Sequence, residues 1–187
     1  MDKRLLKFGE ERRLGLVHQP MKLEHAQAFT EEHHRHTPPL KRHMFTIAAY
    51  EVTETGILIR RELRGIATVA RCSSAWSSYS DRLEIRRLCV TPDAPKNTCS
   101  FLLGKCKQAV FGMGYKVLVT YTQPHESGAS LKGAGFCIDK RAKIIRYTDG
   151  SIEGGLVRWI AEEGCQPDAK DREFTDRILN DLQSFVN

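Results

Sequence analysis

The 187-residue sequence lacks several features that would assign it at once to a class of protein. No apolar run approaches the ~18 residues that a membrane-spanning helix needs, which argues against an integral membrane protein. There is no internal repeat, low-complexity tract or interdomain linker, so we expect one domain over residues 1–187, with a core at 14–160 and an acidic helical extension at 161–187. Residues 1–13 are highly charged and lack the apolar centre of a signal peptide, which indicates a cytoplasmic protein.

The cysteines lack any metal-binding or redox pattern, because no CxxC pair and no zinc-ligand spacing occurs among them. They are Cys72, Cys89, Cys99, Cys106, Cys137 and Cys165. Several lie in apolar stretches, which is typical of buried free thiols in a reducing compartment. Cys99 lies beside an expected helix start, where a lowered thiol pKa is an alternative to simple packing.

Negative charge is scarce in the main body of the chain. The formal charge is +6, but residues 159–187 contain seven acidic and three basic residues and so carry −4. The preceding body therefore carries +10, which suits a polyanionic partner such as DNA. A solvated acidic helix at the C-terminus explains the same asymmetry without a partner.

Hydrophobic periodicity predicts an α/β (α+β) fold, in which a central mixed sheet is flanked by helices and followed by an extra C-terminal helix. We expect strands at 14–19, 44–52, 57–63, 65–71, 83–90, 115–122, 137–147 and 154–160, and helices at 22–35, 98–112, 127–134 and 170–186. Asn97 or Thr98 is expected to cap the second helix, and Asp149-Gly150 to form a turn. Successive strand–helix crossovers between 83 and 134 predict parallel pairing in the centre of the sheet.

Several short motifs resemble those of one particular group of proteins. They are LEIRRLCV at 83–90, Asn97-x-x-Ser100-Phe101-Leu102, Gly114-Tyr115, Thr120-Tyr121-Thr122, Glu126-Ser127-Gly128-Ala129-Ser130-Leu131 and Gly133-Ala134-Gly135-Phe136. This pattern resembles a phage and prophage family of acyltransferase-like proteins with the GNAT fold, related to the Mom DNA-modification protein of phage Mu. The resemblance covers about residues 33–136. It implies a transferase in a bacterial host that adds an acyl or aminoacyl group to an exocyclic base amine in DNA.

The resemblance also assigns individual residues. Arg87 matches an arginine in the strand before the helix, and Ser100 matches a serine at the helix start, both of functional importance in the family. A family Tyr-x-Asp corresponds to Tyr121-Thr122-Gln123, so an amide replaces the carboxylate here. Leu131 occupies the place of a tyrosine that serves as an acid in many GNAT enzymes, which leaves the proton donor unassigned.

Glycine is missing where acetyl-CoA enzymes of this fold have a Q/R-x-x-G-x-G/A loop, since this chain reads Ala94-Pro95-Lys96-Asn97-Thr98-Cys99-Ser100. The loop still precedes a helix N-terminus, which favours a phosphate or another anion. We therefore predict that side chains hold the acyl donor, which is unidentified and for which acetyl-CoA is one candidate. The predicted cofactor-binding residues are Lys96, Asn97, Thr98, Ser100, Ser127 and Ser130.

Histidines cluster at His33, His34 and His36, with His43 seven residues further on. Neutral imidazole suits substrate binding and proton transfer, so we predict substrate binding by this cluster together with Trp76. Iron or zinc binding by His33 and His36 is a second interpretation. A helix C-terminus that favours histidine is a purely structural one.

The predicted catalytic residues are Arg87, Ser100, Tyr121 and Glu126. Strict alternation along the strand at 83–90 places Glu84 and Arg86 on one face and Arg87 on the other, where its planar fork suits a phosphate or carboxylate. Tyr121 ends a central strand, where ligands bind in open α/β sheets. Glu126 follows as a candidate general base, with a capping role as the alternative.

Two further interpretations remain beside DNA modification. The first is an acetyl-CoA-dependent N-acetyltransferase of a small amine or a protein lysine, and the second is a non-catalytic DNA-binding module. Basic residues near the predicted site suit a DNA backbone or a solvated surface equally well. They are Lys41, Arg42, Arg60, Arg61, Arg64, Arg71 and Lys96. Phage or host proteins are further candidate partners.

Overall fold

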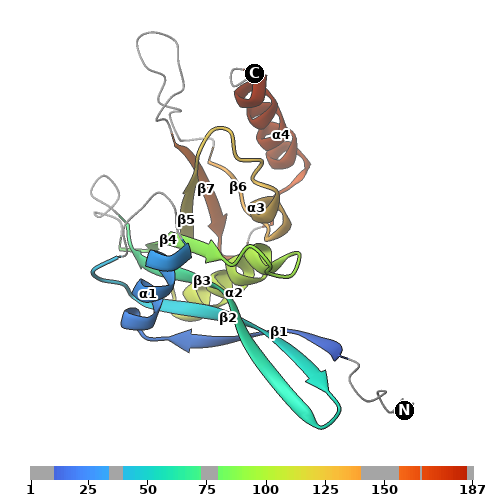
Figure 1. Ribbon diagram of the computed structural model, residues 1–187. Helices are drawn as coiled ribbons and strands as arrows, with labels where there is room; N and C mark the ends of the chain where they lie inside the picture. The colour runs from blue at the N-terminus through green and yellow to red at the C-terminus, as the bar shows by residue number, and fades with distance from the viewer. Residues whose placement is uncertain (1–10, 34–39, 73–79, 140–155, 165, 185–187) are drawn as a thin grey trace.

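The fold was analysed in a computed structural model, which describes residues 11–33, 40–72, 80–139, 156–164 and 166–184 (Figure 1). In chain order the elements are β1 (Glu11–Met21), α1 (Leu23–His33), β2 (Phe45–Thr55), β3 (Leu58–Arg71), β4 (Arg82–Val90), α2 (Thr98–Gly112), β5 (Val117–Thr122), α3 (Ala129–Gly133), β6 (Cys137–Ile138), β7 (Val157–Glu162) and α4 (Ala169–Ser184). The described strands form one seven-stranded sheet in the order β1-β2-β3-β4-β5-β7-β6. The predicted α+β class with a mixed central sheet is confirmed.

Strand direction alternates across the sheet except at its centre. β1 to β4 form an antiparallel meander, β4 and β5 are parallel, and β7 pairs antiparallel with both β5 and β6. The parallel pair is joined through α2, as the strand–helix–strand pattern of the sequence predicts. The carboxyl ends of β4 and β5 therefore meet at one edge, and α2 and α3 both begin there.

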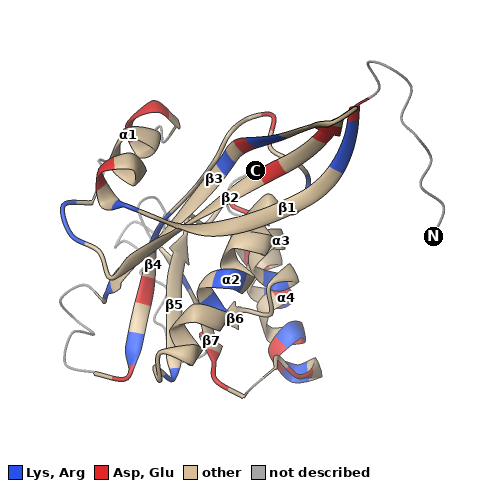
Figure 2. Cartoon of the chain, turned by 90° about the horizontal axis from the view of Figure 1, so that it is seen from below, with Lys and Arg blue, Asp and Glu red and all other residues tan. Residues whose placement is uncertain are grey.

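The helices divide between the two faces of the sheet (Figure 2). α1 covers one face, where Ala26 and Phe29 pack against Ala48, Ile66 and Cys89. α2, α3 and α4 lie on the other face, over the main hydrophobic core. Residues from this core that are fully inaccessible to solvent include Leu83, Leu102, Leu103, Leu118 and Trp159. We call these two sides the α1 face and the α2 face.

The acidic C-terminal helix is part of the α2 face. Leu179 and Leu182 on α4 are 4% and 2% exposed and belong to the main core. The hydroxyl of Thr175 accepts a hydrogen bond from the backbone N–H of Ile138, at 3.1 Å, which fixes α4 against β6. The predicted C-terminal helix is therefore confirmed, and its apolar side packs on the core while Asp176 and Asp181 are exposed.

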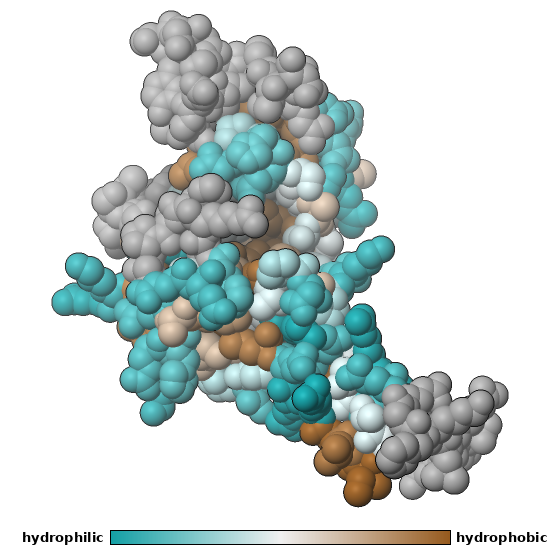
Figure 3. All heavy atoms as spheres, in the orientation of Figure 1, coloured by the Kyte–Doolittle hydropathy of each residue, from teal (hydrophilic) through white to brown (hydrophobic). Residues whose placement is uncertain are grey.

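The β2–β3 hairpin is longer than the sequence suggested. The predicted strands at 57–63 and 65–71 form one continuous strand, in which Arg64 is an extra residue at a β-bulge between the pairs Ala49–Gly65 and Tyr50–Leu63. The tip of the hairpin projects from the body as an apolar surface (Figure 3). Ile57, Leu58 and Ile59 are 99%, 69% and 65% exposed there.

The described thiols agree with a further expectation. The five cysteines among the described residues are free, as predicted, while Cys165 lies outside those residues. None of the described helices combines the length and apolar character that crossing a membrane would require. The predicted Asp149-Gly150 turn also lies outside the described residues.

Candidate functional site

The centre of the candidate site is the place where β4 and β5 separate, which we call the split. Their parallel pairing covers only three positions and ends where Glu84 lies opposite Val119. Beyond this point the Thr120 hydroxyl donates a hydrogen bond to the Ile85 carbonyl, at 3.1 Å, in place of a ladder bond. In the described part of the chain, β4 from Arg86 onward has no strand partner on its β5 side. An open strand edge of this kind offers backbone N–H and C=O groups to a ligand.

A β-bulge in β4 causes this separation and changes the direction of the following side chains. Val69 of β3 lies opposite Ile85, but the next residue, Thr68, lies opposite Arg87, so Arg86 is inserted. A bulge of this type bends its strand and interrupts the alternation of side chains. The residues on either side show the result, because Ile85 and Leu88 both contact the main core of the α2 face.

The expectation that Arg86 and Arg87 take opposite faces is therefore wrong. Both arginines lie on the α1 face together with Glu84, because the inserted residue shifts the alternation by one position. Nε of Arg86 lies 3.5 Å from a carboxylate oxygen of Glu84. Burial and the charge of Arg86 lower the pKa of Arg87, and the Glu84 carboxylate opposes this shift. Nη1 of Arg87 donates to the Arg86 carbonyl at 2.6 Å.

A buried polar cluster continues from Glu84 across β5 and β7 on the same face. Glu84 is 7% exposed, and Tyr121 of β5 lies opposite Arg158 of β7. Nη2 of Arg158 lies 2.6 Å from the Asp139 carboxylate, and the Asp139 N–H donates to the Arg158 carbonyl at 3.0 Å. Arg158 also donates to the Tyr121 oxygen. The cluster thus holds Tyr121 in place through Arg158 and Asp139.

Burial sets the protonation of the groups next to Glu84. The pKa of Tyr121 is raised, first by burial and then by the Glu84 carboxylate, while Arg158 opposes both effects. The hydroxyl therefore keeps its proton at neutral pH and can donate it. Burial, assisted by Glu84, also raises the pKa of the Cys72 thiol to about 11, so Cys72 is a neutral neighbour rather than a nucleophile.

Of the predicted histidine cluster, His33 and His43 are among the described residues. Nδ1 of His43 lies 2.9 Å from the Thr46 hydroxyl, which lies 3.0 Å from the hydroxyl of Thr68, the residue opposite Arg87. Burial lowers the pKa of His43, which keeps its ring neutral. His33 packs against the Phe29 ring at 4.4 Å between centroids. The other predicted substrate-binding residues, His34, His36 and Trp76, lie outside the described residues.

The predicted cofactor-binding residues gather at the N-terminus of α2, at the carboxyl end of β4. Lys96 and Asn97 are exposed, and the Ser100 hydroxyl donates to the Asn97 carbonyl at 3.2 Å. Asn97 adopts a left-handed conformation with φ 70° and makes no side-chain cap bond. The Thr98 hydroxyl bonds backward to the Pro95 carbonyl at 2.6 Å. The expected side-chain cap is therefore absent, because these side chains are oriented by the turn that precedes the helix.

α3 lies against this helix start and brings further predicted residues to it. Ser130 makes a hydrogen bond with the Cys99 thiol, and burial raises the pKa of that thiol despite this bond. Cys99 therefore fits simple packing, and the alternative of a lowered pKa is wrong, because burial outweighs the effect of the helix N-terminus. The Ser127 hydroxyl accepts a bond from the Ala129 N–H at 3.4 Å. Gly128, with φ 61°, is required because any Cβ there would lie 2.2 Å from the Trp159 ring.

Glu126 occupies the turn before α3 and is exposed. Its carboxylate accepts a hydrogen bond from the Gln123 N–H at 2.6 Å, and its own N–H donates to the Gln123 carbonyl at 3.1 Å. These two bonds close the turn and match the capping interpretation of Glu126. Glu84 offers a buried carboxylate at the split instead.

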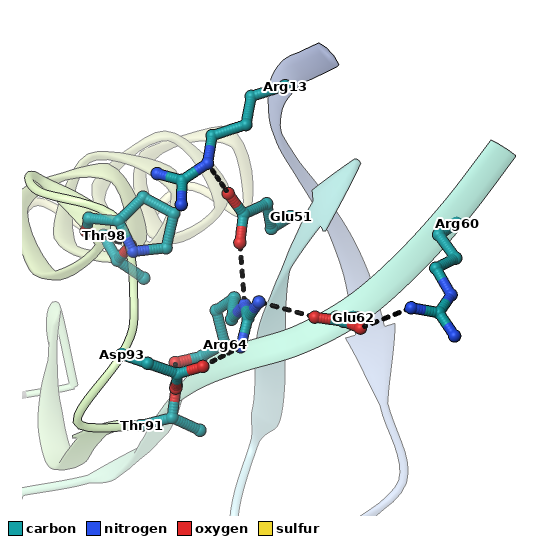
Figure 4. A network of polar contacts seen from close by, with 9 residues as sticks. Arg13, Glu51, Arg60, Glu62, Arg64, Thr91, Asp93 and Thr98 are labelled. Atoms are coloured by element: carbon teal, nitrogen blue, oxygen red, sulfur yellow. Dashed lines mark hydrogen bonds and ion pairs between the residues drawn. The ribbon is translucent and has the colours of Figure 1, made fainter. Parts of the chain in front are cut away.

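A network centred on Arg64 attaches the β4–α2 loop to the sheet (Figure 4). Its guanidinium donates to Glu51 at 2.8 Å, to Glu62 at 2.5 Å and to Asp93 of the loop at 2.5 Å. The Arg64 carbonyl also accepts the Thr91 N–H at 2.9 Å. Burial alone would lower the pKa of Arg64, but the bond to Glu51 and the nearby carboxylates raise it overall. The loop that lacks glycine is thus held by side chains.

Neither a metal site nor the pocket nearest to the cluster adds to this arrangement. Among the described residues, no group of three or more His, Cys, Asp or Glu side chains is arranged to hold a metal ion. A pocket of about 310 Å³ lies beside the cluster, between β6, β7 and the start of α4. Asp139 is the residue that the pocket shares with the cluster.

The structure thus forms two groups of residues at one split in the sheet. Lys96, Asn97, Thr98, Ser100 and Ser130 gather at the starts of α2 and α3, whereas Arg87 and Tyr121 lie on the α1 face. Sequence reasoning missed the roles of Glu84, Arg158 and Asp139. The sequence does contain one signal for these residues. Glu84 in LEIRRLCV and Arg158 in LVRWI are charged residues within apolar strands, and buried charges of this kind are uncommon unless they are paired.

Solved structures of other proteins share the architecture described above. No family model matches the sequence, and no curated protein matches it. Among solved structures, the chain is similar to an IAA acetyltransferase from Bacillus cereus, with a TM-score of 0.54 and 15% identity over 79% of this chain and 99% of that one.

Two similar structures contain cofactor. One is YncA from Salmonella typhimurium with its cofactor acetyl-CoA, with a TM-score of 0.53 and 16% identity over 83% of this chain and 99% of that one. The other is a Bacillus subtilis acetyltransferase in complex with CoA, with a TM-score of 0.50 and 14% identity over 79% and 98%. The predicted fold is therefore confirmed, and this chain has the fold of the GNAT acetyltransferases.

Proposed function

We propose that the protein is an N-acyltransferase that acylates an exocyclic base amine in DNA. The observation that carries this proposal is the split between β4 and β5, which has an open strand edge and, on its α1 face, a buried carboxylate beside a protonated tyrosine. Acyl transfer from a thioester to an amine needs a base for the amine and an acid for the departing sulfur. Glu84 and Tyr121 supply these two groups from neighbouring strands.

The acyl donor fits the open edge of β4 and the N-terminus of α2. The first-turn N–H groups of a helix have no intrahelical acceptor, and here they adjoin Lys96 and the Ser100 hydroxyl. Acetyl-CoA is the candidate donor, because two structures of similar fold contain CoA or acetyl-CoA. When bound, the donor supplies an activated acyl carbonyl. With no glycine between residues 94 and 100, Lys96, Asn97, Ser100 and Ser130 replace part of the backbone cradle.

Each residue of the α1-face cluster has a defined task in the transfer. Glu84 accepts the proton that the amine loses as its nitrogen bonds to the acyl carbon. Tyr121 donates a proton to the sulfur as the carbon–sulfur bond breaks, and Arg158 keeps the hydroxyl oriented for this. Asp139 holds Arg158 and so acts as a positioning residue.

DNA as the acceptor is supported by the net positive charge of residues 1–158 and by the resemblance of residues 33–136 to Mom-related proteins. The body of the chain carries +10, as a protein that binds a polyanion should. We place the reaction in the cytoplasm of a bacterial host, with phage or host proteins as further partners.

Nucleoside mass spectrometry tests this proposal directly. The protein is expressed in a bacterial host, with and without candidate partner genes, and the DNA is digested to nucleosides. We expect a new acylated nucleoside that is absent with Glu84→Gln. Unmodified DNA in cells that contain soluble wild-type protein and its partners would contradict the proposal.

A second candidate function is acetyl-CoA-dependent acetylation of a small amine or a protein lysine. The similar structures that contain CoA or acetyl-CoA favour it. Calorimetry with acetyl-CoA, followed by assays on lysine peptides and small amines, separates it from DNA modification. A non-catalytic DNA-binding module instead predicts that Arg87→Ala and Ser100→Ala leave the phenotype in cells unchanged.

A further inference from the structure

Two consecutive arginines share one face of β4 at the candidate site, which a regular strand does not allow. The bulge at Arg86 places Arg86 and Arg87 together on the α1 face, beside Glu84. Arg87 lies opposite Thr68, and Arg86 reaches the Glu84 carboxylate at 3.5 Å. Two guanidinium groups thus flank the carboxylate to which we assign the proton of the amine.

Two other arginines at this end of the sheet lie beside carboxylates. Arg82 lies 3.1 Å from Asp81, and Arg158 lies 2.6 Å from Asp139. The neighbouring groups on the β3 side are neutral, since Thr68 lies opposite Arg87 and the Cys72 thiol, just after β3, lies near Arg86. Burial and the charge of Arg86 lower the pKa of Arg87, and the Glu84 carboxylate opposes this shift. A second anion beside the two guanidiniums would favour their charged forms further.

We propose that Arg86 and Arg87 form a phosphate subsite, which binds the backbone phosphate next to the base amine that is acylated. This inference rests on the proposed function, because it assigns a substrate class to the same site. The planar guanidinium fork matches the oxygen atoms of a phosphate and forms charge-assisted hydrogen bonds to them. Held in this way, the nucleotide presents its base toward Glu84 and Tyr121.

The same charges disfavour the acceptors of the second candidate function. A lysine side chain or a polyamine carries a positive charge at neutral pH and is repelled by two adjacent arginines. An exocyclic base amine is neutral and is attached to a phosphodiester. The subsite therefore selects an uncharged amine on an anionic scaffold over a cationic amine.

The acyl donor also carries phosphates that two arginines could bind. The fold places the donor phosphates and the acceptor phosphate on different faces of the sheet. Lys96, Ser100 and the N-terminus of α2 lie at the start of the helix on the α2 face. Arg86 and Arg87 point from β4 to the α1 face. We therefore assign the arginines to the acceptor phosphate and the helix start to the donor.

Calorimetry with deoxyadenosine 5′-monophosphate and deoxyadenosine tests the subsite without any acyl transfer. We expect the wild-type protein at low salt to bind the nucleotide about tenfold more tightly than the nucleoside, as charge-assisted bonds to one phosphate would give. Saturating CoA should leave this difference in place. Arg87→Gln should reduce it to about twofold, whereas Arg87→Lys, which keeps the charge but loses the fork, should give an intermediate value.

Arg172→Gln is the matched control, because it removes one charge from an exposed arginine on α4. It should bind both compounds as the wild type does. Thermal melting of each variant identifies misfolding; should Arg87→Gln and Arg87→Lys both misfold, the wild-type comparison of nucleotide and nucleoside decides alone.

Three results would overturn the subsite. These are equal binding of nucleotide and nucleoside by the wild type, a folded Arg87→Gln variant that retains the full difference, and complete displacement of the nucleotide by CoA. Failure of the proposed function looks different, because DNA would then stay unmodified while the nucleotide preference persists. Conversely, acylation of DNA by a protein without phosphate preference would refute the subsite alone.

Discussion

The two faces of strand β4 differ sharply, although both are built from one nine-residue segment. Toward α2, Leu83 and Ile85 are almost completely buried in the main core. Toward α1, the same strand presents Glu84, Arg86 and Arg87. Packing explains the first set. The second set consists of three charged side chains on a largely buried strand, where Glu84 lies 3.5 Å from Arg86. Burying charges is costly even when they are paired, so we infer a functional role for this set.

The two faces of the sheet also divide the proposed reaction into donor binding and acceptor binding. The donor residues belong to the helix starts over the α2 face, and the acceptor residues belong to the α1 face. Variants on one side should therefore change binding of one substrate without changing the other. Each of the following predictions tests one of the two faces or their independence.

The largest effect is expected from Glu84→Gln on the α1 face. Loss of the general base should lower kcat by about 10²–10⁴-fold with little change in melting temperature. Glu126→Gln, which alters an exposed turn, should lower kcat less than about twofold. The rate is measured as release of free thiol from acetyl-CoA in the presence of DNA. Equal losses in both variants would argue against Glu84 as the base.

The packing on the α2 face is tested by Gly128→Ala. The added Cβ would lie 2.2 Å from the Trp159 ring at a residue with φ 61°, so we expect about 2–3 kcal/mol of destabilisation. Gly104→Ala is the counterpart, because a Cβ at this position in α2 meets nothing within 4 Å. It should stabilise the helix by about 0.5–1 kcal/mol. Urea unfolding measures both, and a neutral Gly128→Ala variant would contradict the packing described.

The division between donor and acceptor is tested by Arg64→Gln. This variant removes the group that ties Asp93 of the donor loop to the buried Glu51, so the KM for acetyl-CoA should rise about tenfold, equivalent to ~1.4 kcal/mol. Nucleotide affinity should stay unchanged. Arg60→Gln removes an exposed arginine of the same network and should change neither value appreciably. A fall in nucleotide affinity with Arg64→Gln would show that the two halves are coupled.

The smallest effect concerns the pH dependence of the α2-face core. Burial raises the pKa of Cys106 to about 12 from an ordinary value of 9.0. The thiol therefore ionises in the unfolded chain first, and its contribution to stability, complete below pH 9, is lost as the pH rises toward 12. Between pH 9 and 10, Cys106→Ala should lose about 1 kcal/mol less stability than the wild type. Cys137→Ala, at a half-buried cysteine, should follow the wild-type curve more closely.

The sequence predicted most of the elements, because periodicity and turn residues act locally. The helix at 98–112 was predicted with its observed bounds, and the apolar run before Tyr121 became the parallel central strand. The bulge escaped prediction, since nothing in the letters of LEIRRLCV distinguishes an inserted Arg86 from a regular one. The cluster of Glu84, Arg158 and Asp139 escaped for a different reason. Glu84 and Arg158 come from β4 and β7, and Asp139 directly follows β6, so only the folded sheet brings them together.

The bulge in β4 also determines which changes of length this segment can accept. It absorbs Arg86 as an extra residue, so Leu88 and Val90 face the core although strict alternation from Leu83 would turn them away. Deleting Arg86 would restore a regular strand in which Leu88 and Val90 still face α2. The α1 face would then lose one of its two arginines. In this strand, therefore, the inserted residue is not needed to pack the core, and what it adds is a second guanidinium beside Glu84.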